Sequence, residues 1–176
     1  MLYKNIKAAI LILSVVILLY SCDHGISPKP ASQEVTGFSG KITFLGAWPD
    51  SIKRTHIVVF KDPLLSSSDF NLLNLKFISR EIPFGTAVYY YSSEDSSVIP
   101  GTEAFAPGEY SYVAVVQQAS DELVLVRSAW FVAGIYYTQG DRSNPGKLII
   151  PEDSFVRNID IVCDFNNPPP QPPGGN

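Results

Sequence analysis

The sequence predicts an all-β domain, an antiparallel sandwich of about seven to nine strands. Apolar and polar residues alternate along several short segments, which is typical of strands with one buried face. Turn-forming Pro, Gly, Asn and Asp residues separate these segments, and no strong helical period is present. With 45% apolar and 17% charged residues, the 176-residue chain has the composition of a globular protein and a length that suggests one domain.

The expected strands are spread over residues 41–165. Residues 55–61 (THIVVFK) are nearly all apolar, as for a central strand. Residues 109–117 would place Tyr110, Tyr112, Ala114 and Val116 on one side. In residues 155–165 the residues Ile159, Ile161, Cys163 and Phe165 would share a face.

Shorter strands are expected at residues 41–44, 86–91 and 147–150. Residues 122–137 hold two apolar segments, or one long strand bent near Gly134. Residues 69–75 (DFNLLNL) are ambiguous and could form a short helix capped by Ser68 or Asp69.

The N-terminal 21 residues have the features of a secretory signal helix. Lys4 and Lys7 supply positive charge, and the apolar run at residues 8–20 follows them. Thirteen residues in a helix span about 20 Å, less than the ~30 Å hydrocarbon core, so the run fits a signal better than a membrane-spanning helix.

The run ends in Leu19-Tyr20-Ser21-Cys22, which resembles the bacterial lipoprotein box. In that motif a small residue precedes a cysteine that receives a diacylglycerol. The resemblance implies cleavage after residue 21, lipid attachment at Cys22 and a membrane anchor in the bacterial cell envelope, with the outer membrane favoured. A plain signal peptide cleaved nearby and an uncleaved anchor helix are the alternatives.

The rest of the chain divides into three parts. Residues 22–34 are polar and rich in Ser, Pro and Gly, and we expect a flexible tether. Residues 35–165 form the β-sandwich domain. Residues 166–176 (NNPPPQPPGGN) contain five prolines in eleven residues, and we expect a disordered tail.

Three segments of the domain resemble one family of exported domains. Residues 40–44 (GKITF) look like a G-x-(V/I)-x-F first strand, and residues 106–115 (APGEYSYVAV) look like a Pro-Gly-x-Tyr turn that leads into an inner strand. Residues 145–150, followed by residues 158–161, resemble the closing strands. These motifs are similar to those of carboxypeptidase regulatory-like, or prealbumin-like, domains, which are related in fold to transthyretin.

The resemblance covers about residues 37–165, with the insert at residues 63–79 as its departure. It implies an immunoglobulin-like or prealbumin-like sandwich that serves as a structural or interaction module. It implies no catalytic residues.

Composition argues against several classes of function. The formal charge of −4 disfavours nucleic acid as a partner, and two His with two Cys nearly exclude a zinc site. His56 and Cys163 are expected to be structural, the latter as a buried and inert thiol. The acidic pairs at residues 94–95, 121–122 and 152–153 are read as solvated turns rather than a calcium site. We therefore expect no catalytic residue, no cofactor and no metal.

Aromatic residues are the one feature that suggests a binding surface. Tyr90 should point opposite to Tyr89 and Tyr91, and Trp130 should point opposite to Phe131. Trp48, beside a Pro-Asp turn, is the best single candidate for an exposed contact, with Tyr90 and Trp130 as further candidates.

The expected function is a non-catalytic, lipid-anchored binding or scaffolding module with an envelope protein or polysaccharide partner. Carbohydrate binding by coplanar exposed aromatics is the alternative. A small hydrolase is a second alternative, which the small number of His and Cys residues disfavours.

Overall fold

Ten strands and two 3-10 helices make up the secondary structure in the computed structural model, which describes residues 35–95, 105–138 and 141–175. This part of the chain is all-β, as predicted. The expected signal helix and tether lie outside the described residues. In order, the elements are β1 (Gly37–Leu45), β2 (Arg54–Phe60), η1 (Ser67–Asp69), β3 (Leu75–Ile78), β4 (Val88–Ser92), β5 (Gly108–Tyr110), β6 (Tyr112–Gln118), η2 (Arg127–Ala129), β7 (Phe131–Ile135), β8 (Leu148–Ile150), β9 (Phe155–Val156) and β10 (Ile161–Asp164).

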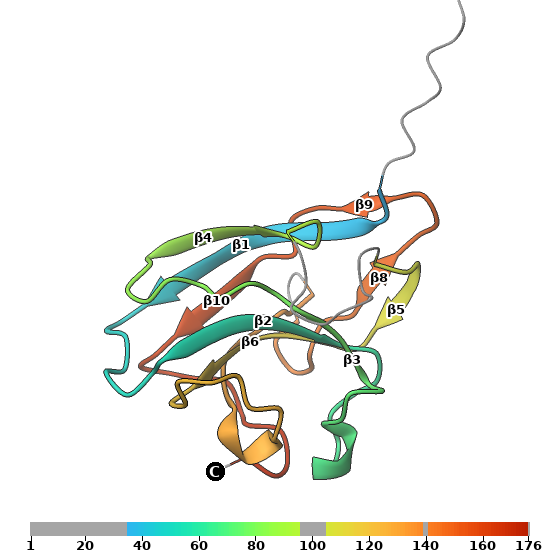
Figure 1. The fold of residues 1–176 in the computed structure, drawn as a ribbon. Helices are drawn as coiled ribbons and strands as arrows, with labels where there is room; N and C mark the ends of the chain where they lie inside the picture. Colours follow the sequence, from blue (N-terminus) through green and yellow to red (C-terminus); the bar gives the residue numbers. More distant parts are fainter. Residues whose placement is uncertain (1–34, 96–104, 139–140, 176) are drawn as a thin grey trace, which may run out of the picture. The chain divides into compact units, whose positions relative to one another are not determined.

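The strands form two four-stranded sheets and one small two-stranded sheet. The first has the order β10-β1-β4, with β9 also paired to β1, and the second has the order β3-β2-β6-β7 (Figure 1). Strands β5 and β8 make the third. Pairing is antiparallel except along β1, which runs parallel to β9 and β10, so the expectation of a purely antiparallel arrangement is wrong there.

Two hydrophobic cores lie on opposite faces of the second sheet, and alternation along β2 separates them. Ile57 and Val59 enter the inner core, between the two four-stranded sheets, whereas Val58 and Phe60 enter the outer core. The arrangement is therefore sandwich-like, with β2 central and buried on both faces, as its apolar sequence predicts.

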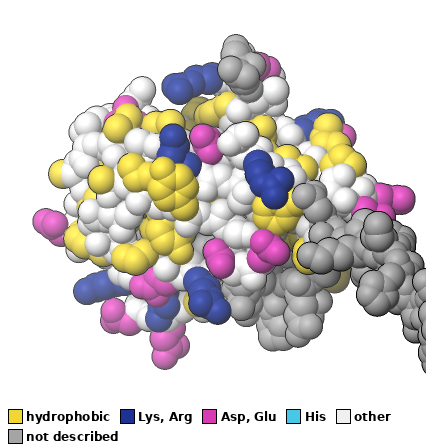
Figure 2. Space-filling model, turned by 90° about the horizontal axis from the view of Figure 1, so that it is seen from above, with side chains coloured by type: hydrophobic (Ala, Val, Ile, Leu, Met, Phe, Trp, Pro, Cys, Tyr) yellow, Lys and Arg dark blue, Asp and Glu magenta, His cyan; other side chains and the backbone are white. Residues whose placement is uncertain are grey.

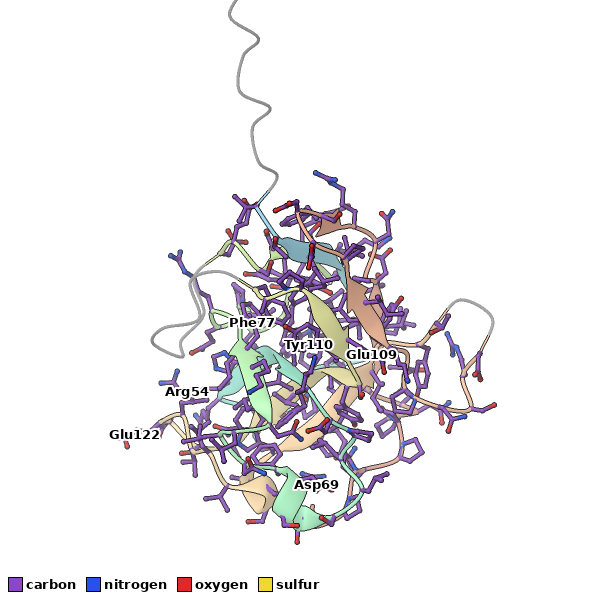
Figure 3. All side chains as sticks on the ribbon, turned by 90° about the vertical axis from the view of Figure 1, so that its right-hand side faces the viewer. Arg54, Asp69, Phe77, Glu109, Tyr110 and Glu122 are labelled. Atoms are coloured by element: carbon purple, nitrogen blue, oxygen red, sulfur yellow. The ribbon has the colours of Figure 1, made fainter. Side chains whose placement is uncertain are left out.

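The inner core also receives side chains from the small sheet. Figure 3 shows Phe77 of β3 and Tyr110 of β5 among the interior side chains, whereas Arg54 and Glu122 lie at the periphery. In Figure 1, η1 and η2 lie beneath β2 and β6, on the side of the outer core. Connecting segments therefore cover the outer face of the second sheet.

Two irregularities change which face a side chain occupies. Tyr110 packs in the inner core and Tyr112 in the outer core, because the strand is interrupted at Ser111, whose N–H donates to the Lys61 carbonyl. The expectation that both tyrosines share a face is wrong for this reason. In β7 a bulge at Ala133 lets both Val132 and Ile135 face the outer core.

The insert at residues 63–79 contains the strand β3, and its residues 70–74 do not form the short helix that the sequence left open. Only η1 is helical, and its Asp69 carboxylate accepts hydrogen bonds from the N–H groups of Leu65 and Ser66. Asn71 and Asn74 bind nearby backbone groups through their side chains, which competes with helical hydrogen bonds. Likewise, residues 122–137 supply one short strand, β7, after η2.

Candidate functional site

Trp130, one of the three predicted contact residues, is not available to a ligand. Its side chain is only 2% exposed and belongs to the outer core. The indole packs edge-on against Phe70, with ring centroids 5.1 Å apart, and its N–H donates to the Val124 carbonyl. Phe131 is partly exposed, so the predicted opposition of the two side chains is confirmed, but the candidate contact at Trp130 is wrong.

Trp48 closes one end of the inner core instead of standing free. Its ring centroid lies 4.6 Å from that of Phe44 and 5.3 Å from those of Phe84 and Phe165. The indole N–H donates to the carbonyl oxygen of Thr86 at 3.1 Å. Because these contacts leave Trp48 half-buried, the aromatic that this end presents to solvent is Phe84, at 58% exposure.

Tyr90 is the predicted contact that the structure leaves open, at 76% exposure. Its neighbour Tyr91 points into the inner core, where its hydroxyl donates to the Ile159 carbonyl at 2.5 Å. Desolvation in the core raises the pKa of the Tyr91 hydroxyl well above its usual value. The predicted opposition within the tyrosine triplet is therefore confirmed.

Tyr90 belongs to a sheet face that no other described element covers, which we call the open face. It consists of the outward side chains of β1, β4 and β10: Lys41, Thr43, Leu45, Val88, Tyr90, Val162 and Asp164. The register places Tyr90 beside Lys41, and Val88 beside Thr43. On the other side of β1, Thr43 lies beside Val162.

The open face presents both apolar and charged groups. Figure 2 looks down on this side of the molecule, and hydrophobic side chains gather over the part where β1 and β4 lie in Figure 1, with Lys, Arg, Asp and Glu among them. The Lys41 ammonium lies 3.9 Å from the Asp160 carboxylate, whose other oxygen accepts the Lys41 backbone N–H at 2.9 Å. Because both side chains are about half exposed, this pair contributes little to stability and remains available for a ligand.

A groove of about 560 Å³ adjoins the open face along β10, and we call it the β10 groove. It is lined from the open face by Leu45, Val162 and Asp164, and further by Asp160, Arg142 and residues 167–170. The groove therefore combines apolar walls with both signs of charge, a lining suited to binding.

His56 and Cys163, whose side chains could act as a base or a nucleophile, are buried away from this face. His56 lies on β2, with Nδ1 2.9 Å from the Ser79 carbonyl oxygen, and burial lowers the pKa of its imidazole. Cys163 is fully buried in the inner core, and burial raises its thiol pKa, which disfavours the nucleophilic thiolate.

The described residues show neither a metal centre nor a membrane-spanning helix. No group of three or more His, Cys, Asp or Glu side chains there is placed to hold a metal ion. In the same part of the chain, no helix has the length and apolar character needed to cross a membrane. Cys22, the predicted lipid attachment residue, lies outside the described residues.

The C-terminal proline-rich segment is docked on the domain rather than extended into solvent. Gln171 bonds to the backbone of Val132 in β7, and the Pro172 carbonyl accepts a hydrogen bond from Arg127. The expectation of a disordered tail is wrong for residues 166–175, because side-chain and carbonyl groups supply the hydrogen bonds that proline nitrogens cannot donate. Gln171, the one residue that interrupts the prolines, is the signal in the sequence that could have indicated docking.

Comparisons with protein-family models, with curated proteins and with solved structures found no match to this chain in any of the three.

Proposed function

We propose that this chain is a non-catalytic binding or scaffolding module of the bacterial cell envelope, held at the membrane by lipid on Cys22. The lipoprotein box and the apolar run before it support the anchor. The observation that carries the binding role is the 76% exposed Tyr90 on the open face, whose opposite edge, at β10, adjoins the β10 groove.

An exposed tyrosine with aliphatic neighbours is a typical anchor for a protein partner. Tyrosine offers a large apolar ring with little side-chain entropy to lose, and such residues dominate many interfaces. Val88 lies two residues before Tyr90 on the same face of β4, and Val162 lies across β1 from Val88, so the face that carries the ring also exposes aliphatic side chains. Charges around an apolar centre are the usual composition of an interface.

A protein partner fits this surface better than a polysaccharide. Stacking on sugar rings calls for flat aromatics that are exposed together, and Trp48 is held by the rings and the carbonyl described above. Tyr90 would then provide a single platform. Carbohydrate binding therefore becomes an outcome of the test rather than the leading proposal.

The finer fold assignment is also a proposal. An immunoglobulin-like or prealbumin-like sandwich is supported by residues 40–44, which lie within β1, and by the Pro107-Gly108 turn, which leads into β5. Gly108 has a φ of +142°, which a residue with a side chain rarely adopts. Such modules in exported proteins fit a scaffolding role.

The test compares Tyr90→Ser with Ile149→Ser, a matched change at an exposed apolar strand position in the small sheet. Each full-length chain is expressed in intact cells, cross-linked, captured, and its companions identified and quantified. We expect one stoichiometric protein partner with the unmodified chain and with Ile149→Ser, and at least a tenfold loss with Tyr90→Ser. Equal recovery with both variants would contradict the role of the open face, and capture of polysaccharide alone would favour the carbohydrate alternative.

The anchor has its own readout. With Cys22→Ser we expect loss of incorporated labelled fatty acid and movement of the chain from the membrane to the soluble fraction. Unchanged lipid labelling of that variant would refute attachment at Cys22.

A further inference from the structure

The docked C-terminal segment, residues 167–175, contacts its own domain from Pro169 onward. Pro172 is buried and Pro169 and Gly175 are partly buried, whereas Pro168 and Pro173 are exposed. Consecutive prolines favour an extended polyproline conformation, and the segment leaves it in a turn at Pro173-Gly174. The segment therefore contacts the domain through a proline-rich stretch and the turn that follows it.

Gln171 attaches the segment to the free side of β7. Its side-chain oxygen accepts the Val132 N–H at 2.8 Å, and its side-chain N–H donates to the Val132 carbonyl at 2.9 Å. One amide side chain thus makes the two bonds that a neighbouring strand would make. Asn is too short to make both bonds from the same backbone position, and Ala would make neither.

Arg127 of η2 holds the next residue of the segment. Its side chain is only 6% exposed, and its two terminal nitrogens donate to the carbonyl oxygens of Trp130, at 2.5 Å, and Pro172, at 2.7 Å. Hydrogen bonds from a charged donor in a buried place are stronger than those at an exposed one. The Pro172 carbonyl is therefore bound at a defined position on the domain.

The two glycines near the end of the segment lie so close to the domain that a side chain would clash. A Cβ on Gly174 would lie 2.6 Å from Cβ of Ser67, and one on Gly175 would overlap the Arg127 guanidinium. Gly174 also has a φ of +79°, which disfavours any side chain. The binding position thus accepts Gln-Pro-x-Gly-Gly. It disfavours any side chain at Gly174, and a side chain at Gly175 requires the Arg127 guanidinium, which bonds Pro172, to move.

A second groove, of about 460 Å³, borders the seated segment. Leu64, Tyr112, Tyr137 and Pro145 are among its lining residues, together with Gln171 and Pro172 themselves. Grooves with aromatic walls are the usual receptors for proline-rich peptides. The seat formed by Arg127, Val132 and this groove therefore has the parts of a peptide-binding site.

We propose that this seat is an exchangeable peptide-binding site, and that its ligand in trans is the same segment of a second copy of this chain. The structure shows the seat filled by the chain's own segment, and a second copy carries the same Gln, Pro and Gly-Gly at the required spacing. Exchange of the segment between two copies would replace each contact with an identical one. The proposal does not use the side chains of the open face, although residues 167–170 of the segment also line the β10 groove.

The chain's own segment occupies the seat, and this lowers the apparent affinity expected for an added peptide. A segment joined by a short linker competes at an effective concentration in the millimolar range, so an added peptide meets a seat that is already filled. Release of the internal segment should therefore reveal binding that the unmodified chain hides.

The first experiment uses a fluorescent peptide with the sequence of residues 166–175 and the full chain. It is titrated into the unmodified chain, into Gln171→Ala, and into Gln171→Ala/Gly175→Ala, with circular dichroism as the check on folding. We expect at least tenfold tighter binding to the double variant than to the unmodified chain, with Gln171→Ala between them. Equal binding to all three chains, or none to either folded variant, would overturn the proposal.

Matched peptides test whether the seat reads the sequence. A peptide with Gly175→Ala should lose binding at least tenfold, because its methyl group meets Arg127, whereas one with Pro173→Ala should bind as the original does, because Pro173 is exposed. If both peptides bind equally well, the seat does not recognise the segment and the proposal fails.

A complementation experiment tests the second copy as the partner. Arg127→Gln weakens the seat but keeps the segment, and Gln171→Ala/Gly175→Ala keeps the seat but weakens the segment. We expect a one-to-one complex in the mixture by size-exclusion chromatography with light scattering, and monomers in each variant alone. Monomers in the mixture at a concentration tenfold above the measured peptide Kd would overturn exchange between copies.

Discussion

Gly134 is the position where a single added methyl group gives the sharpest test of how the two sheets meet. It lies in β7, opposite β10, and a Cβ there would lie 2.6 Å from the Cys163 sulfur. The same Cβ would lie 2.9 Å from both the Ile161 side chain and the Val162 carbonyl oxygen. Contacts between nonbonded heavy atoms are favourable near 3.5–4.0 Å, so one strand would have to move by about 1 Å.

The expected magnitude follows from two opposing terms. Overpacking of a closely packed core typically costs about 1–3 kcal/mol. Replacement of Gly by Ala also restricts the unfolded chain, which stabilises the fold by about 0.4–1 kcal/mol. We therefore expect Gly134→Ala to lower the free energy of unfolding by about 1–2 kcal/mol.

Urea unfolding, followed by tryptophan fluorescence, measures this change, and a double-mutant cycle with Cys163→Ala assigns its cause. Removal of the sulfur deletes the atom nearest to the added methyl group. The double variant should therefore lose about 0.5–1.5 kcal/mol less stability than the sum of the losses in the two single variants. Additivity within about 0.3–0.5 kcal/mol, or no loss of stability in Gly134→Ala, would refute the close approach of β7 and β10.

Two further predictions concern buried polar groups. Burial lowers the pKa of His56, so the unfolded state binds the proton more tightly than the folded state. The free energy of unfolding should therefore fall as the pH drops below about 6.5, by at most about 1.4 kcal/mol per pH unit. His56→Asn should lack this pH dependence in urea titrations at pH 5.5–7.5, and the same pH dependence in both chains would contradict the prediction. Tyr91→Phe removes the hydroxyl that bonds the Ile159 carbonyl and should cost about 1–3 kcal/mol in the same assay, whereas a cost below about 0.5 kcal/mol would show that the bond is unimportant.

The strands with regular alternation were predictable from local pattern alone. In residues 55–60 every side chain is apolar or buried, and the pattern predicts a central strand, which is β2. The tyrosine triplet was also predictable, because neighbours in a strand point to opposite faces whatever the surrounding fold. Both inferences depend on geometry within a few residues.

The irregular positions were not predictable, because their cause lies far along the chain. The break at Ser111 depends on the Lys61 carbonyl, fifty residues earlier, and the bulge at Ala133 depends on its pairing with β6. An apolar pattern read with a period of two assigns the wrong face after each of them. Local sequence carries no mark of either partner.

Whether a candidate contact residue is exposed depends on which distant side chains pack against it. Trp48 and Trp130 are large apolar residues near turns, and the sequence does not say that Phe84 and Phe70 pack against them. Gln171 was missed for the opposite reason, since proline-rich ends are usually solvated and its partner is a strand edge.

The parallel pairing of β1 has a consequence for the order in which the domain can fold. β1 is near the start of the domain, yet the Lys41 N–H bonds to Asp160, 119 residues later in the chain. A chain that emerges from its N-terminus can complete the β1–β4 pair early, but one side of β1 stays open until β9 and β10 have followed. Closure of so long a loop is slow, so we infer that the first sheet is finished last. A chain cut short before β10 keeps β1 paired to β4 and β9 but leaves the rest of one edge of β1 unpaired.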